Sequence, residues 1–317
     1  MRHGMIMICM LLGFILLLTG CKRRPLVEVD NNVLINITFE EEIVNYEMTK
    51  YPEMMRVIFF DSETGDFASQ SFLPHYGGNV YVMAGRSYDV LVYNFDTEST
   101  IIGEDDNIWS IYAYTNLIPE NLKSKLKGRA ENNGEEQIVF EPDHLYVGKM
   151  EDVYIPKRGY GMPPYEINIH AETVVETWIV EIDKIRGAEY VGAVSTVISG
   201  LADYNLIGQR EQSFDEATVF FEAASLGKDG HFYAKFNTFG RNALADRKQV
   251  LSLVLTDTGG KNWCFNMDIS QKFVDNPEQY ILIKTDDIVI EKPEQTGGGG
   301  LAPSVDEWGE INTEIVI

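Results

Sequence analysis

The sequence predicts an all-β protein built from two antiparallel β-sandwiches in series. The first observation is the length of 317 residues, because single domains cluster near ~100–150 residues. The second is a series of short stretches in which apolar and polar residues alternate, separated by glycine, aspartate and asparagine at ~8–12-residue spacing. The third is that helical patterns are confined to one or two short segments. A hydrophobic content of 44% is enough to build real cores.

Alternating stretches fill the first half of the chain, and a period of two is typical of a strand with one buried face. The predicted strands are Val33–Phe39, Met55–Phe60, Gln70–Leu73, Asn79–Met83, Tyr88–Phe95, Gln137–Phe140 and Leu145–Gly148. The residues 61–66 (DSETGD) predict a turn. One short helix is expected over Pro119–Leu126, because proline lies near its first turn and Gly128 follows its end.

A segment rich in proline and glycine divides the chain. Ile155–Glu166 holds three prolines and two glycines in twelve residues, which predicts a linker between domains. We therefore expect one sandwich over residues 33–155, a linker over 156–166 and a second sandwich over 167–296. The strands expected in the second half are Ile167–Ile185, Tyr190–Gly200, Ala217–Ala223, His231–Thr238, Val250–Thr256, Tyr280–Lys284 and Ile288–Ile290, with one helical turn at Asp268–Val274.

The first twenty residues have the organisation of a secretory signal. Met1–Met5 carries Arg2 and no acid, and Ile6–Leu18 is an apolar run too short to span a bilayer as a helix. The run ends in Leu18-Thr19-Gly20-Cys21, which resembles the bacterial lipobox. That resemblance implies removal of residues 1–20 and attachment of diacylglycerol to the Cys21 thiol, followed by further acylation, for example with palmitate. The alternative is a signal anchor with a chance cysteine.

Several acyl chains on one residue give stable membrane attachment, so residues 21–32 are expected to form a lipidated tether. Its basic cluster, Lys22–Arg24, either touches anionic head groups or is solvated. Without the signal only Cys21 and Cys264 remain, so no internal disulfide is expected, and Cys264 is predicted to be a buried small hydrophobe. A net charge of −23 argues against nucleic acid as a partner.

The C-terminal residues 297–317 form a separate feature. Gly297–Gly300 predicts a flexible connection to the alternating segment Trp308–Ile317, in which Ile311, Thr313, Ile315 and Ile317 share one face. Three outcomes stay open for this predicted strand. It folds back as an edge strand of its own second domain, it is donated to a neighbouring chain whose sheet it completes, or it is disordered.

The motifs of catalysis and metal binding are missing. The sequence has no Cys-x-x-Cys, His-Glu-x-x-His, Gly-x-Ser-x-Gly or phosphate-binding glycine loop. His170 and Glu172 share one face of a predicted strand, but a surface pair is far commoner than a metal site. Asp105-Asp106-Asn107 and Asp61-Ser62-Glu63 lack the spacing of a calcium loop and predict turns. We therefore expect no catalytic residues, no metal and no cofactor, although no pattern excludes a spatial pair of acids.

Several segments together resemble a family of Bacteroidales lipoproteins of formerly unknown function, similar to fimbrillin-type proteins and to the anchor subunits of the FimA and Mfa fimbriae. The resemblance covers nearly the whole mature chain and contains no catalytic residues to transfer. Beside the lipobox, the segments that carry it are Tyr88–Thr100 (YDVLVYNFDTEST), Glu141–Val147 (EPDHLYV), Val194–Leu201 (VSTVISGL), Phe236–Gly240 (FNTFG) and the C-terminal GGGG and EWGEINTEIVI.

The resemblance implies two transthyretin-like β-sandwich domains and a non-enzymatic role in surface pili assembled by β-strand exchange. Stalk subunits of that superfamily lose an N-terminal segment by cleavage after arginine, whereas anchor subunits keep their lipid. The basic candidates for cleavage are Lys50 and Arg56, and Arg56 lies inside a predicted strand, where proteases reach poorly. The expectation is an uncleaved anchor or accessory subunit, lipid-anchored in the outer membrane through Cys21, exposed on the cell surface and associated with other fimbrial subunits.

Two other classes stay open at this stage. A surface lipoprotein that binds glycans or host ligands predicts an exposed platform of two or three coplanar aromatic rings. An enzyme predicts a cleft with converging carboxylates or histidines and perturbed pKa values. The fimbrial interpretation predicts neither, and instead requires a sheet edge or groove that accepts a strand.

Overall fold

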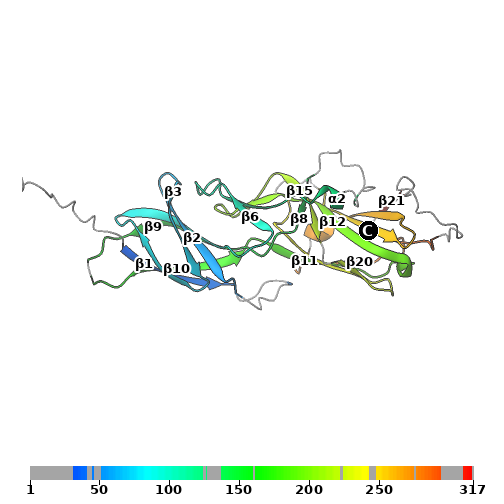
Figure 1. The fold of residues 1–317 in the computed structure, drawn as a ribbon, viewed down its shortest axis with the longest axis horizontal. Helices are drawn as coiled ribbons and strands as arrows, with labels where there is room; N and C mark the ends of the chain where they lie inside the picture. Colours follow the sequence, from blue (N-terminus) through cyan, green and yellow to red (C-terminus); the bar gives the residue numbers. More distant parts are fainter. Residues whose placement is uncertain are drawn as a thin grey trace, which may run out of the picture.

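A computed structural model describes residues 31–40, 45, 51–123, 126, 137–159, 161–221, 224–242, 248–274, 276–293 and 310–315. Strands dominate this part of the chain, and its two short α-helices are α2 (Glu120–Lys123) and α3 (Ser270–Val274). The predicted all-β class is therefore confirmed. The molecule is elongated, with β1 at one end and β21 near the other (Figure 1). None of the described helices is both long enough and apolar enough to cross a membrane.

The first stack of strands is a seven-stranded sheet in the order β3-β2-β5-β9-β10-β1-β4. Its strands are β1 (Asn31–Phe39), β2 (Met54–Asp61), β3 (Phe67–Pro74), β4 (Gly77–Val82), β5 (Arg86–Asn94), β9 (Tyr146–Ile155) and β10 (Tyr165–Thr173). Strands β9 and β10 pair only where Tyr146 and Val147 meet Thr173 and Glu172. This short contact joins two layers, β3-β2-β5-β9 and β10-β1-β4, whose inward side chains share one apolar core.

The second stack has two sheets, in the orders β16-β17-β11-β20 and β21-β19-β18-β12-β15-β8. Its strands are β8 (Ile138–Phe140), β11 (Glu176–Ile182), β12 (Val191–Ala202), β15 (Glu216–Phe221), β16 (Ala224–Leu226), β17 (Phe232–Thr238), β18 (Val250–Asp257), β19 (Asn262–Asp268), β20 (Tyr280–Ile283) and β21 (Glu310–Ile315). Buried residues from both sheets, among them Trp178, Phe236 and Phe265, form one core.

A small sheet lies between the two stacks, in the order β14-β13-β7-β6. Its strands are β6 (Thr100–Gly103), β7 (Tyr112–Thr115), β13 (Tyr204–Leu206) and β14 (Glu211–Gln212). A third core joins it to both halves, because Ala113 of β7 packs with Ile58 and Leu91 of the first stack and with Phe239 after β17. The stacks are thus connected by buried apolar contact as well as by the chain.

The expected linker 156–166 does not connect the two stacks. Residues 156–164 join β9 to β10 within the first sheet, and Val33–Phe39 of β1 pairs in parallel with Tyr165–Ala171. The chain passes to the second stack at Val174 and Val175, which break the predicted strand Ile167–Ile185 in two. Both residues are apolar, so alternation along the sequence did not reveal the break. Whether residues 33–155 and 167–296 fold independently stays a prediction.

Strand β8 also crosses the expected boundary. It belongs to the connection between β5 and β9 of the first stack, yet it pairs in parallel with β15 of the second (Thr218 with Ile138 through Phe220 with Phe140). The first half of the sequence therefore supplies an edge strand to the sheet of the second half. This intramolecular strand contribution interlocks the two stacks.

Candidate functional site: the terminal strands and the junction between the stacks

The first described strand, β1, lies inside its sheet. It pairs in parallel with β10 on one side and antiparallel with β4 on the other. Its inward residues Val33, Ile35, Ile37 and Phe39 are all buried, with exposures of 0–8%. Removing this strand would expose an apolar face of the core and the hydrogen-bonding edges of two neighbours.

Arg56, one of the two basic residues considered for cleavage, is held within β2. Its side chain is only 11% exposed and forms an ion pair with Asp105. The guanidinium also donates hydrogen bonds to Tyr93 Oη (2.7 Å) and Gln70 Oε1 (2.7 Å). Burial raises the pKa of Tyr93 to about 12, so this hydroxyl stays protonated. A protease would have to unfold β2 to reach Arg56; Lys50 lies outside the described residues.

The C-terminal strand β21 lies at the edge of the six-stranded sheet, where Glu310–Ile315 pairs in parallel with Asn262–Met267 of β19. Ile315 is 5% exposed and joins the core of the second stack. Of the three outcomes considered for Trp308–Ile317, the structure therefore shows the edge strand of its own domain. Within the described residues, β19 is the only strand paired with β21.

Asp143 organises a turn at the junction between the stacks. Its Oδ2 atom accepts hydrogen bonds from the backbone N–H groups of Glu98 (2.8 Å), Ser99 (2.5 Å) and Thr100 (3.0 Å). The backbone N–H of Asp143 in turn donates to Thr100 Oγ1 at 2.8 Å. These bonds tie the segment that follows β5 to the segment that precedes β9.

Asn237 and Thr177 connect this turn to the second stack. The Asn237 side chain donates from Nδ2 to the Pro142 carbonyl (3.0 Å) and accepts from Thr177 Oγ1 at Oδ1 (2.8 Å). The backbone N–H of Asn237 donates to Glu141 Oε2 at 2.9 Å. Residues of β11 and β17 thus bind backbone and side-chain groups of the connection between β8 and β9.

His144 completes the network. Its Nε2 lies 3.0 Å from Thr177 Oγ1, and its carbonyl accepts a hydrogen bond from Asn94 Nδ2 (3.1 Å). The pKa of His144 is lowered to about 4, mainly by burial. The positive charge of Lys235 also lowers this pKa, and its effect is larger than the opposite effect of Asp143. The imidazole is therefore neutral near pH 7, as a structural hydrogen-bonding group rather than a charged one.

Four of the segments that carry the family resemblance meet at this junction. Tyr88–Thr100 supplies Asn94 and the turn bound by Asp143, Glu141–Val147 supplies the turn itself, and Phe236–Gly240 supplies Asn237. Val194–Leu201 ends beside them, because Ala202 N–H donates to the Gly240 carbonyl at 3.0 Å. These segments therefore fix how the two stacks meet.

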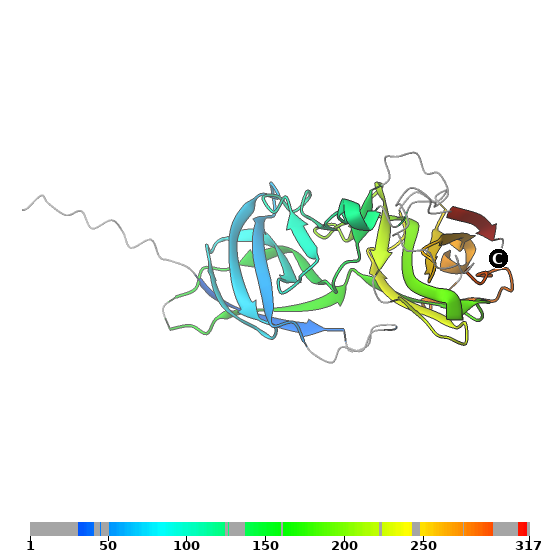
Figure 2. The same ribbon diagram turned by 45° about the vertical axis from the view of Figure 1, so that its right-hand side comes forward.

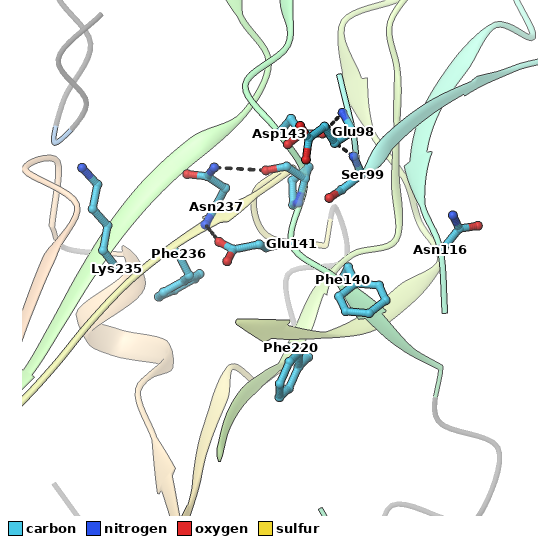
Figure 3. Close-up of a pocket in the computed structure, with 11 residues that line it drawn as sticks. Glu98, Ser99, Asn116, Phe140, Glu141, Asp143, Phe220, Lys235, Phe236 and Asn237 are labelled. Carbon is cyan, nitrogen blue, oxygen red and sulfur yellow. Dashed lines mark hydrogen bonds between the residues drawn. The ribbon is translucent and has the colours of Figure 1, made fainter. Parts of the chain in front are cut away.

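A cleft of about 640 Å³ opens at the junction (Figure 3). Phe140 and Phe220 line it as an edge-to-face pair with ring centroids 6.3 Å apart. Glu141 and Asp143 also line it, but backbone N–H groups occupy oxygens of both carboxylates. The remaining lining residues are Glu98, Ser99, Asn116, Pro142, Lys235, Phe236 and Asn237. The acids of this cleft therefore serve to hold the turn.

The polar candidates from the sequence are engaged by other side chains. His170 Nδ1 lies 3.1 Å from Thr38 Oγ1, whereas Glu172 forms an ion pair with Arg210, whose hydrogen bond lowers the pKa of Glu172. Asp61 Oδ1 accepts the Glu63 N–H within the turn that follows β2. No group of three metal-ligating side chains occurs in the described residues. Cys264 is buried in β19, and the predicted lipidation site Cys21 lies outside the described residues.

Aromatic side chains gather near the start of β2. Tyr51 stacks on His75 with ring centroids 5.2 Å apart and 5° between their planes, but Tyr76 meets His75 edge-on at 84°. Phe72 and Phe95 form a second, tilted pair at 56°. These rings do not form a single plane of the kind expected for a glycan platform.

Comparison with known proteins identifies the relatives of this chain. Residues 20–222 match a protein family described as a domain of unknown function, DUF5119. The chain belongs to this family. A protein of Bacteroides ovatus provisionally named fimbrium anchoring subunit Fim4B is 26% identical over 348 residues, covering 100% of this chain and 98% of the relative.

Solved structures show the same fold. A candidate adhesin of Bacteroides ovatus matches with a TM-score of 0.65 and 25% identity, covering 87% of this chain and 98% of that one. The fimbrial anchor protein Mfa2 of Porphyromonas gingivalis matches with a TM-score of 0.50 and 14% identity, over 80% of this chain and 90% of that one. The resemblance to fimbrillin-type proteins predicted from the sequence is thereby confirmed.

Proposed function

We propose that this DUF5119 member is a non-enzymatic, fimbria-related protein of the cell surface, an anchor or accessory subunit held in the outer membrane by lipid on Cys21. The observation that carries the proposal is the contrast between its terminal strands. A core-filling β1 lies between β4 and β10, and a subunit that escapes cleavage would keep this strand. The edge strand β21 is placed where it can be exchanged with another subunit.

The relatives support the proposal at a coarser level, since the full-length relative is named for fimbrium anchoring and a similar structure is that of a candidate adhesin. Each stack contains layers of mainly antiparallel strands over one core, which fits the tandem transthyretin-like arrangement implied by the resemblance. The glycan-binding alternative has less support, because the exposed rings near β2 lie in different planes.

Mass spectrometry of the native protein tests the anchor. The expected mature chain begins at Cys21 and carries acyl chains, and Cys21→Ala should be released from the membrane fraction. A lipid-free chain that begins at Val57 or near Lys50 would contradict the proposal.

A reversible disulfide between β21 and β19 tests strand exchange. Asn312 is the register partner of Cys264 in the parallel β19–β21 pair, and neighbouring strands lie within the Cα separation of ~4.4–6.8 Å that a disulfide requires. Asn312→Cys should therefore cross-link β21 to its own sheet under oxidising conditions. Association with fimbrial subunits should be lost when oxidised and recovered after reduction, whereas Asn312→Ser should behave like wild type.

Equal assembly by the oxidised and reduced forms of Asn312→Cys would exclude donation of β21. Deletion of Trp308–Ile317 gives an independent result. A truncated protein that folds but does not assemble supports donation, and one that unfolds shows that β21 is only part of its own domain.

A further inference from the structure

The end of the first stack at which β1 begins is also the end nearest to Cys21 in sequence. Asn31, the first residue of β1, pairs with Val82 at the end of β4. Gly85 N–H donates to the Ile155 carbonyl at 2.7 Å, which brings the β4–β5 and β9–β10 connections to the same end of the molecule (Figure 2). Residues 22–30 separate Cys21 from β1, and ten residue steps span at most ~35 Å. A lipid on Cys21 therefore confines this end to the neighbourhood of the bilayer.

Large apolar side chains are exposed around this end. Tyr81 is 67% exposed, Met83 57%, Tyr154 55% and Met162 58%. Tyr81 belongs to β4 and Tyr154 to β9, so the two tyrosines lie on different layers of the sandwich and flank its end. Met83 and Met162 lie in the connections between the layers. Tyrosine at the margin of an apolar surface is typical of a membrane interface, where the ring is buried and the hydroxyl stays hydrated.

Three basic side chains belong to the connections at this end. Segments 81–88 and 154–165 contain Arg86, Lys157 and Arg158 and no acidic residue, in a chain with 49 acids and a net charge of −23. Arg158 donates to the Pro163 carbonyl at 2.7 Å and lies over the Tyr165 ring, so it braces the β9–β10 connection. Acids border these segments: Asp61, 4.0 Å from Arg86, lies in the turn 61–66 with Glu63 and Asp66, and Asp89, Asp152 and Glu166 lie next to the segments in sequence.

Two exposed apolar side chains elsewhere lie beside acids. Phe214 is 66% exposed, but Asp215 and Glu216 follow it directly. Phe95 is 51% exposed and precedes Asp96. An anionic bilayer would repel those two surfaces, whereas the basic side chains of the connections that carry Met83 and Met162 favour contact with it.

We propose that this end of the first stack is a membrane-docking surface. Tyr81, Met83, Tyr154 and Met162 enter the boundary between head groups and acyl chains, and Arg86 and Lys157 face lipid phosphates. The proposal rests on the proposed lipid at Cys21, which brings the surface to the bilayer. It adds a second, non-covalent contact that orients the long axis of the molecule away from the membrane.

Depth-dependent fluorescence quenching tests this contact. The acylated full-length protein is reconstituted into vesicles of phosphatidylcholine with phosphatidylglycerol and nitroxide-labelled phospholipid. An environment-sensitive thiol label is attached through Met162→Cys, with Phe214→Cys as the matched exposed control, both in a Cys264→Ser background. We expect the label at position 162 to be quenched severalfold more than the label at 214. Combining Met162→Cys with Arg86→Glu and Lys157→Glu should remove most of this quenching, while circular dichroism stays unchanged.

Flotation of the same samples distinguishes failure of the docking surface from failure of the proposed lipid anchor on Cys21. If the protein floats with the vesicles but the labels at 162 and 214 are quenched equally, the docking surface is excluded and the lipid anchor stands. If the protein does not float and its mass shows no acyl chains, both proposals fail. Quenching at 162 that persists after both charge reversals would contradict the role assigned to Arg86 and Lys157.

Discussion

The first and last described strands of this chain are similar in sequence pattern but differ in how they are held. Strand β1 has neighbours on both sides and fills the core with four buried apolar residues. Strand β21 pairs along one side with β19, and Ile315 is the residue of this strand that the structure shows to be buried. The same alternation of apolar and polar residues therefore occurs in an inner strand near one terminus and in an edge strand near the other.

The largest loss of unfolding free energy is expected from a substitution in β1. Ile35→Ala removes a fully buried side chain from the first core and should lower the free energy of unfolding by about 3 kcal/mol, since transfer and cavity costs add. Chemical denaturation of the intact chain measures this loss. A loss below about 1 kcal/mol would mean that β1 is as dispensable as an edge strand.

The second-largest loss of stability is expected at the junction between the two stacks. Asn237→Ala deletes the bonds to Pro142 and Thr177 and should cost about 2 kcal/mol, because partly buried groups lose their hydrogen-bonding partners. Asn168→Ala, which removes an exposed side-chain bond to Asn36, is the matched control and should change stability by less than about 0.5 kcal/mol. Equal effects would show that the two stacks do not depend on this junction.

His144 should make the junction sensitive to pH. Its folded-state pKa of about 4 lies below the ordinary value of 6.5, so the unfolded chain binds a proton first as the pH falls. The stabilisation that depends on neutral His144 is complete above pH ~6.5 and declines as the pH falls. At pH 5 the free energy of unfolding should be about 2 kcal/mol lower than at pH 7 because of this residue. His144→Gln should remove this component when its denaturation is compared with wild type at pH 7 and pH 5. Parallel pH profiles for the two proteins would contradict the assignment.

The smallest effect is expected in β21, although Ile315 is also buried. Ile315→Ala should cost about 1 kcal/mol, because an edge strand can detach before the remainder of the sheet unfolds and this limits the loss. Hydrogen exchange provides a second measurement, in which amides of β21 should exchange faster than those of β1. A loss as large as that for Ile35→Ala would remove the contrast between the two termini.

Local alternation was sufficient to predict most strands. Val33–Phe39 and Tyr88–Phe95 were expected within two residues of the observed β1 and β5, because one face of each strand is apolar. The parallel pairs of β1 with β10, β8 with β15 and β19 with β21 connect distant segments. Their pairing depends on tertiary contacts that a period of two does not encode. This is why the sequence did not predict that residues 156–164 connect two strands of the first sheet.

The hydrogen bonds of the junction were harder to predict from the sequence than the strands were. Segments Glu141–Val147 and Phe236–Gly240 contributed to the family resemblance, but neither pattern indicated that Asn237 binds Pro142 and Thr177. Such bonds join residues far apart in sequence through single side chains, so they leave no periodic trace.

The parallel pairing of β1 with β10 has a mechanical consequence. A pull toward the membrane enters β1 at its first residue, whereas a pull from the second stack reaches β10 at its last residue, where the chain continues to β11. Because the two strands run in the same direction, these forces act at opposite ends of the pair and load its hydrogen bonds in shear, all at once instead of one by one. If the proposed lipid on Cys21 holds the chain, tension along the long axis is therefore resisted in the first sheet by the whole β1–β10 pair at once.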